Sequence, residues 1–382
     1  MFYAICPGGR GPQYRLIACV AALGFAAPAS AFVSLSADSD LYLTGVAQAT
    51  RNDNVFLSHT NAQTDTIYDL APGLLYEFGR NSMTSGQLGA GVDFQRYARE
   101  HTLNSELPSG FGTLDYADDK LKLDFKGSYQ KADLATRDVH LAGDLVKREL
   151  YHGEGKGEWV MTDKTALGTG VVYDDTVYHK AGYVDWRWVE VPVNYYYKVE
   201  PKVDLSAGVR WRNNQLGTGG INSNDYYYNV GARGEFTGKL TGMFTVGYNQ
   251  FVLAKGGTLS GLGVDAGFTF QATEKTALTL NATNDFGYAA IGTAFRNPGG
   301  NVGFTSELTD KWTVRGQVGY GRFDYTTSLQ RDDFYQAQIG TTWAFSKQVS
   351  LTVAYAYLRD DSNIAIDSFR NNQYSASTSL KF

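Results

Sequence analysis

Apolar and polar residues alternate along most of this chain with a period of two, and polar stretches separate the alternating segments. Two such segments are "WTVRGQVGYGRFDY" (312–325) and "YQAQIGTTWAF" (335–345), joined by the polar stretch 326–333. Successive side chains of a strand point to opposite faces, so this period predicts β-strands. The predicted unit is a strand, a polar loop, a second strand and a tight turn.

The unit repeats at a nearly constant interval. Short polar turns such as "MTDKTA" (161–166) and "ATEKTA" (272–277) return every 36 to 38 residues, marked by Lys164, Lys202, Lys239, Lys275, Lys311 and Lys347. Thr-Asp-Lys and Glu-Pro-Lys are compact turn sequences. One face of each predicted strand is apolar, with aromatic residues near its ends, whereas the other face carries charged residues, amides and glycine.

Strands of this length and polarity are typical of a transmembrane β-barrel, which needs about 9–11 spanning residues per strand. Lipid cannot satisfy an open sheet edge, so the sheet must close. We therefore predict an all-β, antiparallel, up-and-down transmembrane barrel over residues 32–382. The short turns would be periplasmic, and longer segments such as 217–225 and 359–370 extracellular.

We predict 18 strands, with 16 as the alternative. Seventeen are easily counted, but both termini on one side require an even number. Stepping back one unit from Lys164 leads to Lys126, so we divide 114–138 there into two strands. The preceding turn is expected at 79–85, and a long loop around 100–110 widens the interval between the two turns.

Residues 1–31 have the features of a secretory signal peptide. Arg10 and Arg15 precede the apolar run 16–27, and Ala29-Ser30-Ala31 provides an A-x-A cleavage site. Both cysteines, Cys6 and Cys19, lie in this segment, so the mature chain would have none. We expect export to the bacterial outer membrane.

The chain ends on a strand that alternates up to phenylalanine. Tyr374, Leu380 and Phe382 share its apolar face, which resembles the C-terminal signal by which bacterial outer-membrane barrels are recognised by the barrel assembly machinery.

One segment breaks the alternation. In 185–199 the residues from Val189 to Val199 share a face, but Trp186 and Trp188 have the opposite parity. This predicts either a bulge near Val189 or tryptophans that lie above the membrane.

The segment "ATRNDNVFLS" (49–58) resembles a motif of the putative β-barrel porin family of Gram-negative outer membranes. Asp53, Asn54, Val55 and Phe56 match the Asp/Ser-Asn-hydrophobic-Phe string of that family. Some members accompany exopolysaccharide-production genes, so the resemblance implies passage or export of polysaccharide. It implies no catalytic residues and no cofactor.

Other chemistries have weaker support. The histidines (His59, His101, His140, His152 and His179) show no metal-ligand spacing. An outer-membrane lipid or ester hydrolase is the least favoured alternative, because no histidine in a clear strand faces a serine at the same depth. The phosphate-loop-like "GEGKGEW" (153–159) reads as a strand with a glycine face. The net charge of −5 gives no reason to expect a nucleic-acid partner.

Four acidic pairs are expected at the extracellular rim: Asp118-Asp119, Asp174-Asp175, Asp332-Asp333 and Asp360-Asp361. Carboxylates bind the divalent cations that bridge lipopolysaccharide phosphates, so these pairs are candidate cation sites; solvated loops are the alternative.

The polar faces supply candidate residues for the lining of an aqueous lumen: Arg210, Arg212, Arg233, Glu235, Asn281, Arg315, Gln317, Gln336 and Gln338. An amide-rich wall of mixed charge suits hydroxylated solutes. Salt bridges that only stiffen the wall are an equal alternative. We predict a passive channel for saccharide or polysaccharide, not an enzyme, in contact with outer-membrane lipids and lipopolysaccharide; the competing class is a structural or surface-interaction barrel with a plugged lumen.

Overall fold

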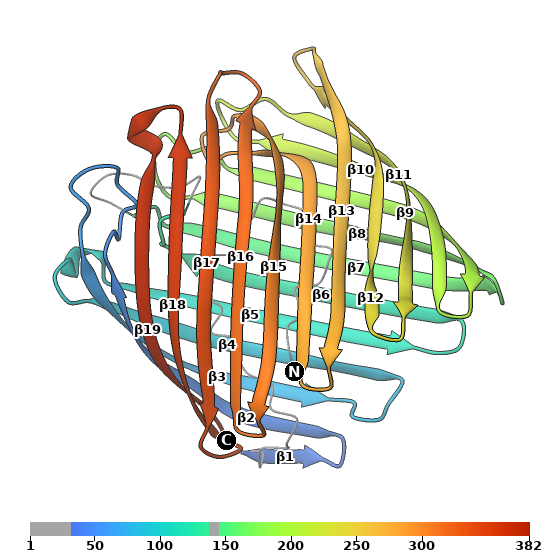
Figure 1. Cartoon of the computed structure of the whole chain (residues 1–382), viewed down its shortest axis with the longest axis horizontal. Coiled ribbons are helices and arrows are strands. Elements are labelled where there is room, and N and C mark those ends of the chain that lie inside the picture. The colour runs from blue at the N-terminus through green and yellow to red at the C-terminus, as the bar shows by residue number, and fades with distance from the viewer. Residues whose placement is uncertain (1–31, 137–144) are drawn as a thin grey trace.

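The computed structural model describes residues 32–136 and 145–382, most of which lie in antiparallel strands (Figure 1). The predicted signal peptide and His140 lie outside the described residues. The strands are β1 (Val33–Ser36), β2 (Ser39–Asn52), β3 (Asp65–Phe78), β4 (Thr84–Tyr97), β5 (Ser105–Ala117), β6 (Leu121–Ala132), β7 (Arg148–Thr162), β8 (Thr165–Tyr178), β9 (Trp186–Glu200), β10 (Val203–Leu216), β11 (Ser223–Thr237), β12 (Leu240–Leu253), β13 (Thr258–Thr273), β14 (Thr276–Tyr288), β15 (Ala294–Thr309), β16 (Trp312–Tyr325), β17 (Arg331–Ala344), β18 (Val349–Ser362) and β19 (Phe369–Lys381). Two short 3-10 turns, η1 (His101–Leu103) and η2 (Ala365–Asp367), lie in loops.

The strands β2 to β19 form a closed barrel of 18 strands, as predicted. Each pairs with its neighbour in the chain, and β19 pairs with β2 from Gln373↔Asn52 to Lys381↔Thr44. Short β1 forms a small antiparallel hairpin with the start of β2. The strands are tilted and connected alternately by tight turns and longer loops (Figure 1). We call the two rims the short-turn end, which holds Phe382, and the long-loop end.

The outer face carries a girdle of aromatic residues near each end, as expected for a wall in contact with lipid. Trp312 and Trp343 lie 5.8 Å apart near the short turns, and Tyr320 and Tyr335 lie 5.3 Å apart toward the long loops. Tyr320 follows Trp312 by eight residues on β16, about 26 Å along the strand. With the strand tilt of about 35–45° typical of outer-membrane barrels, this is about 20 Å along the membrane normal, comparable to but less than their apolar band of about 25 Å.

Our placement of one turn was wrong. Lys126 lies inside β6, and the turn between β5 and β6 is formed by Asp118 to Lys120. The carboxylate of Asp118 accepts hydrogen bonds from the backbone N–H groups of Lys120 (2.8 Å) and Leu121 (2.7 Å). Asp118 and Asp119 therefore lie at the short-turn end, not at the long-loop rim. The loop expected at 100–110 is also shorter, because β5 begins at Ser105.

The bulge offered as one explanation of the tryptophan parity is absent from β9. The register of β9 with β10 is regular from Trp186↔Leu216 to Lys198↔Asp204, so no bulge lies near Val189. Trp186 and Trp188 lie at the start of β9, at the long-loop end, are only 8% and 2% exposed and belong to a buried apolar cluster. Their position above the membrane stays a prediction. They point into the barrel.

The far end of β14 leaves the barrel wall. Its pairing with β13 ends at Val264↔Asn284, although β13 continues beside β12 to Thr258. From Asp285 onward β14 pairs only with β15, and Figure 1 shows it bending away from β13. The carbonyl of Leu262 on the exposed edge of β13 accepts a hydrogen bond from the Asn284 amide (2.7 Å). This contact partly satisfies the free edge.

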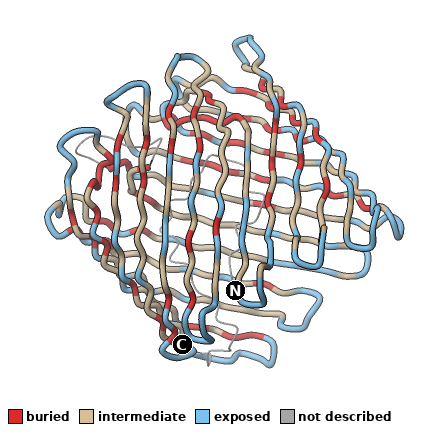
Figure 2. The backbone as a smooth tube through the Cα atoms, in the orientation of Figure 1, coloured by how far each residue is buried: buried red, intermediate tan, exposed pale blue. Residues whose placement is uncertain are grey.

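Buried positions gather toward the long-loop end (Figure 2). Val55 and Phe56 of the β2–β3 loop pack with Tyr97 and with Leu145 of the β6–β7 connection. Leu57 packs with Phe334 of β17. Loops thus fold into this mouth of the barrel.

Candidate functional site: the inner wall and its folded mouth

The inner face of the barrel is identified by ion pairs between strands that are not neighbours. Arg233 of β11 reaches Glu158 of β7 across the interior, at 2.5 Å and 2.9 Å, and also binds Asp204 of β10. Its guanidinium stacks on the Tyr196 ring, 3.4 Å from the centroid. Side chains of the same parity on these strands face inward.

By this alternation the nine predicted lumen residues all face inward, but their surroundings differ. Arg233 and Glu235 are half-buried, and Glu235 pairs with Lys202 at 2.6 Å. Asn281 donates a hydrogen bond to Asn301 (3.1 Å), and Gln317 lies directly opposite Gln338. The remaining residues of the set are Arg315 and Gln336, both half-buried, and the buried pair Arg210 and Arg212.

Arg210 and Arg212 form a buried charge cluster instead of lining an open path. They are 2% and 0% exposed, and both bind Asp225 of β11 and Asp285 of β14. Glu190 of β9 lies 3.5 Å from the Nε of Arg210. The cluster contains two cations and three carboxylates, and its guanidinium groups stack on Tyr227 and Trp188. These two arginines therefore form salt bridges, which was the alternative to a role in lining the lumen.

The cluster holds the end of β14 inside the barrel. Arg210 reaches Asp285 at 2.8 Å, and Arg212 donates a hydrogen bond to the carbonyl of Phe286 at 2.8 Å. Because β14 no longer pairs with β13 beyond Asn284, and its backbone at Phe286 is reached by Arg212 of β10, the end of β14 lies inside the barrel.

The tip of the β14–β15 hairpin reaches across the mouth to the β8–β9 loop and the start of β9. The ring of Tyr288 lies 5.8 Å from that of Trp186 on β9, and the carbonyl of Ala290 accepts a hydrogen bond from Val184 N–H (2.8 Å). Gly292 lies against Val184, since an added Cβ would meet its side chain at 3.0 Å. We call residues 285–294 the inner hairpin. The carboxylates that bind the two buried arginines (Glu190, Asp225 and Asp285) were not predicted from the sequence, because no local pattern brings β9, β11 and β14 together.

Toward the short-turn end the inner wall is accessible to water. Gln271, Thr279 and Gln338 face inward by alternation and are nevertheless exposed. Side chains therefore do not fill the interior at these positions.

The family-like motif joins the first barrel strand to the last. The carboxylate of Asp53 accepts hydrogen bonds from the backbone (2.7 Å) and amide (2.6 Å) of Asn372 on β19. Asn54, 2% exposed, donates to the carbonyls of Ser58 and Arg370. Val55 and Phe56 are buried inside the mouth. The motif closes the seam and turns the β2–β3 loop inward.

The predicted C-terminal signal lies on the outer face of the same seam. Tyr374, Leu380 and Phe382 are exposed, at 58%, 39% and 43%. Phe382 exchanges two backbone hydrogen bonds with Leu43 of β2, at 2.8 Å and 2.9 Å. The final residue thus completes the β19–β2 pairing.

A serine does face a histidine at the same depth, contrary to the sequence analysis. Ser128 of β6 lies opposite His152 of β7, which lies opposite Asp174 of β8. His152 Nδ1 is 3.1 Å from Asp174 Oδ1. Among the described residues no hydrogen bond joins Ser128 to His152, although a nucleophile and its base normally make one. Ser128, His152 and Asp174 thus lie in the order of a catalytic triad, but the serine–histidine hydrogen bond of such a triad is absent among the described residues.

The three acidic pairs at the long-loop end are each divided between the two faces. Asp174, Asp332 and Asp360 are buried. Their neighbours point outward and bind arginines: Asp175 binds Arg187, Asp333 binds Arg322, and Asp361 binds Arg359. Adjacent residues of a strand cannot chelate one ion together.

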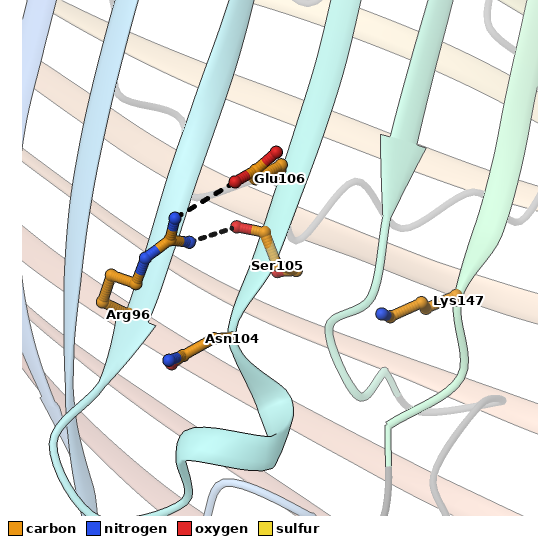
Figure 3. A pocket seen from close by; sticks show the side chains of 5 residues that line it. All are labelled: Arg96, Asn104, Ser105, Glu106 and Lys147. Atoms are coloured by element: carbon orange, nitrogen blue, oxygen red, sulfur yellow. Dashed lines mark hydrogen bonds and ion pairs between the residues drawn. The ribbon is translucent and has the colours of Figure 1, made fainter.

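A pocket of about 410 Å³ lies at the long-loop end and is lined by Arg96, Asn104, Ser105, Glu106 and Lys147 (Figure 3). Arg96 donates hydrogen bonds to the carbonyl of Ser105 (3.0 Å) and to Glu106 (3.2 Å). These contacts tie β4 to β5. Within residues 32–136 and 145–382, no three His, Cys, Asp or Glu side chains are arranged to hold a metal ion.

A comparison with protein families gives one match for the second half of the barrel. Residues 209–382, from within β10 to the end of the chain, match the family described as "Putative beta-barrel porin 2". Over these residues, slightly less than half of the chain, the sequence is similar to a β-barrel porin family. The resemblance stated from the sequence is thus supported. The Asp53–Phe56 motif lies outside the matched range, so its link to the family stays a prediction.

Among solved structures this barrel is similar to several outer-membrane proteins. The ferric citrate transporter FecA is 12% identical, with 84% of this chain and 60% of FecA covered and a TM-score of 0.47. Pseudomonas aeruginosa OpdQ is 9% identical, with 90% and 98% covered and a TM-score of 0.47. Pseudomonas aeruginosa OpdK is 12% identical, with 90% and 99% covered and a TM-score of 0.48. No curated protein matches the sequence.

Proposed function

We propose that this barrel is a passive outer-membrane channel for a saccharide or polysaccharide. The observation that carries the proposal is the amide-rich inner wall of β14 to β17. Gln317 and Gln338 face each other there, Asn281 bonds to Asn301, and Gln338 is exposed inside the barrel. Amides offer donors and acceptors without net charge, which suits hydroxylated solutes.

Transport through such a wall would follow the solute gradient. In the charged sector of the wall, Arg233 is paired with Glu158 and Asp204. The inner hairpin would restrict access from the long-loop end.

A plugged structural barrel is the second candidate, favoured by the loops at the mouth. Trp186 and Trp188 of the wall pack there on Tyr288 of the inner hairpin, and Leu145 of the β6–β7 connection packs on Phe56. A hydrolase is favoured only by the Ser128–His152–Asp174 row.

Planar-bilayer conductance of the purified protein separates these candidates. We expect steady ion flux that falls when oligosaccharide is added, because sugar at the amide wall excludes ions. Absence of ion flux, both without sugar and with each sugar tested, would refute the channel and favour the plugged barrel. Labelling of Ser128 by a fluorophosphonate probe would favour the hydrolase, and a Ser128→Ala variant controls for labelling elsewhere.

The route to the membrane belongs to the same proposal. Residues 1–31 would be removed as a signal peptide, and the barrel assembly machinery would read the strand that ends at Phe382. The genomic neighbourhood would test the export of exopolysaccharide.

A further inference from the structure

Four arginines project from the outer face at the long-loop end of β16 to β19. They are separated by even numbers of residues from exposed outer residues of the same strands, such as Val318, Ile339 and Tyr374, so they point to the same face. We call them the arginine patch: Arg322 on β16, Arg331 on β17, Arg359 on β18 and Arg370 on β19. We propose that this patch binds the phosphate groups of a phosphorylated glycolipid in the surrounding outer leaflet.

Carboxylates orient two of these guanidinium groups while leaving donors available. Arg322 binds Asp333 through Nε at 2.8 Å, and Arg331 binds Asp324 through Nε at 3.0 Å. Each guanidinium still carries two terminal NH2 groups, which match the oxygens of a phosphate. Arg322 is 33% and Arg331 56% exposed, so lipid can reach both.

The other two arginines form a like-charge pair. Arg359 and Arg370 are direct cross-strand partners on β18 and β19. Such a pair destabilises a sheet unless an anion compensates it. Arg359 is compensated by Asp361 (2.8 Å and 2.6 Å), whereas Arg370 is exposed and has no ion pair among the described residues. The position between them is suited to an anion.

The height of the patch matches a lipid headgroup. Tyr320 and Tyr335 lie directly on the membrane side of Arg322 and Asp333, and the Arg359 guanidinium is 6.0 Å from the Tyr335 ring. Tyrosines of this kind mark the interface between hydrocarbon and headgroups. The chain carries a net charge of −5, yet β16 to β18 supply three outward aspartates (Asp324, Asp333 and Asp361) beside the four arginines, and the nearby Asp53 is engaged by Asn372.

The geometry also changes how the acidic pairs would contact lipopolysaccharide. The outward carboxylates Asp333 and Asp361 are engaged by arginine, so direct arginine–phosphate contact replaces the cation bridge suggested by the sequence. The proposal rests on the proposed placement in the outer membrane, with the long loops facing outside.

Native mass spectrometry of the detergent-solubilised full barrel tests the inference. The probes are bisphosphorylated lipid A and the same lipid with its phosphates removed. For Arg359→Ala/Arg370→Ala we expect binding of the phosphorylated lipid to weaken about 30-fold, taking about 1 kcal/mol per arginine near an anionic lipid surface. The control Lys275→Ala/Lys311→Ala removes two cations from the short-turn end and should bind like the wild type.

Two results would overturn the inference. One is equal binding of phosphorylated and dephosphorylated lipid by the wild-type barrel, a comparison that needs no variant to fold. The other is equal weakening in both double variants. Conductance measured on the same samples keeps this test separate from the proposed function, because a barrel without ion flux can still bind lipid.

Discussion

Arg210 on β10 and Asp285 on β14 are joined at 2.8 Å although three strands lie between theirs in the wall. This contact holds the inner hairpin in the mouth. Arg210 and Arg212 also bind Asp225, and Arg210 lies near Glu190. If Asp285 withdrew, two cations and two carboxylates would remain. The wall cluster would then stay balanced, so the inner hairpin can be released without leaving an unpaired buried charge.

Replacing Asp285 by alanine should therefore open the mouth. Loss of hydrogen bonds to charged partners should weaken docking of the inner hairpin by about 2 kcal/mol, roughly a 30-fold increase in the undocked population. We expect larger and more frequent openings in single-channel recordings. Asp265→Ala, on the inner face of β13, is the control for removing an inward carboxylate; unchanged openings in D285A would show that the inner hairpin does not limit flux.

A disulfide should have the opposite effect. Cysteines at Val184 and Ala290, whose backbones share a hydrogen bond of 2.8 Å, would tie the inner hairpin to the β8–β9 loop. The mature chain has no other cysteine if residues 1–31 are removed. We expect reduced conductance after oxidation and recovery with reductant, and no response in either single-cysteine variant. A response in a single variant would point to another cause.

The amide wall can be tested separately from the mouth. Gln317→Ala/Gln338→Ala removes facing amides from β16 and β17. We expect oligosaccharide to block the current about tenfold less tightly, the loss of one to two hydrogen bonds, with little change in sugar-free conductance. Gln250→Ala, on the outer face of β12, makes the same chemical change away from the lumen. If both proteins keep wild-type sugar block, the amides do not contact the solute.

The sequence predicts the wall of this barrel better than its mouth. Period-two alternation identifies the outward Trp312 and the inward Gln338, because in a closed sheet the face follows from parity. The repeat interval, by contrast, misplaced a turn at Lys126, because the long β6–β7 connection stretches the interval from Lys120 to Lys164 to 44 residues. A constant 36-residue step cannot register such an insertion.

Contacts across the interior could not be predicted for a different reason. The alternation predicts that Arg210 faces inward. Its burial, however, depends on Asp285, 75 residues further along the chain, where β14 leaves the wall. Nor does alternation anticipate Trp186 and Trp188 inside the barrel, since an apolar residue on the inner face makes sense only when a loop folds against it. In both cases the missing information is the path of the inner hairpin.

The side chain of Phe382 should matter for assembly more than for stability. Its backbone hydrogen bonds to Leu43 survive a change to alanine, and its ring is 43% exposed. Phe382→Ala should therefore reduce the amount of barrel inserted in cells while refolding in detergent proceeds normally. Phe345→Ala, which removes another exposed ring at the short-turn end, is the control. Equal losses in cells and in detergent would indicate a structural role instead of a recognition signal.

Asn54 should be the most sensitive position of the family-like motif. Its amide donates to Ser58 and Arg370 and its carbonyl accepts from Ser58 N–H, so the side chain holds the β2–β3 loop against β19. Asn54→Ala leaves buried backbone groups without partners, which costs about 1–3 kcal/mol for each group. We expect a lower urea midpoint in lipid vesicles and a mouth that opens more readily. Asn194→Ala, whose side chain makes no hydrogen bond within the described part of the chain, should leave the midpoint near that of the wild type. A normal midpoint for Asn54→Ala would mean that the remaining seam, from Gln373↔Asn52 to Lys381↔Thr44, closes the barrel without the motif.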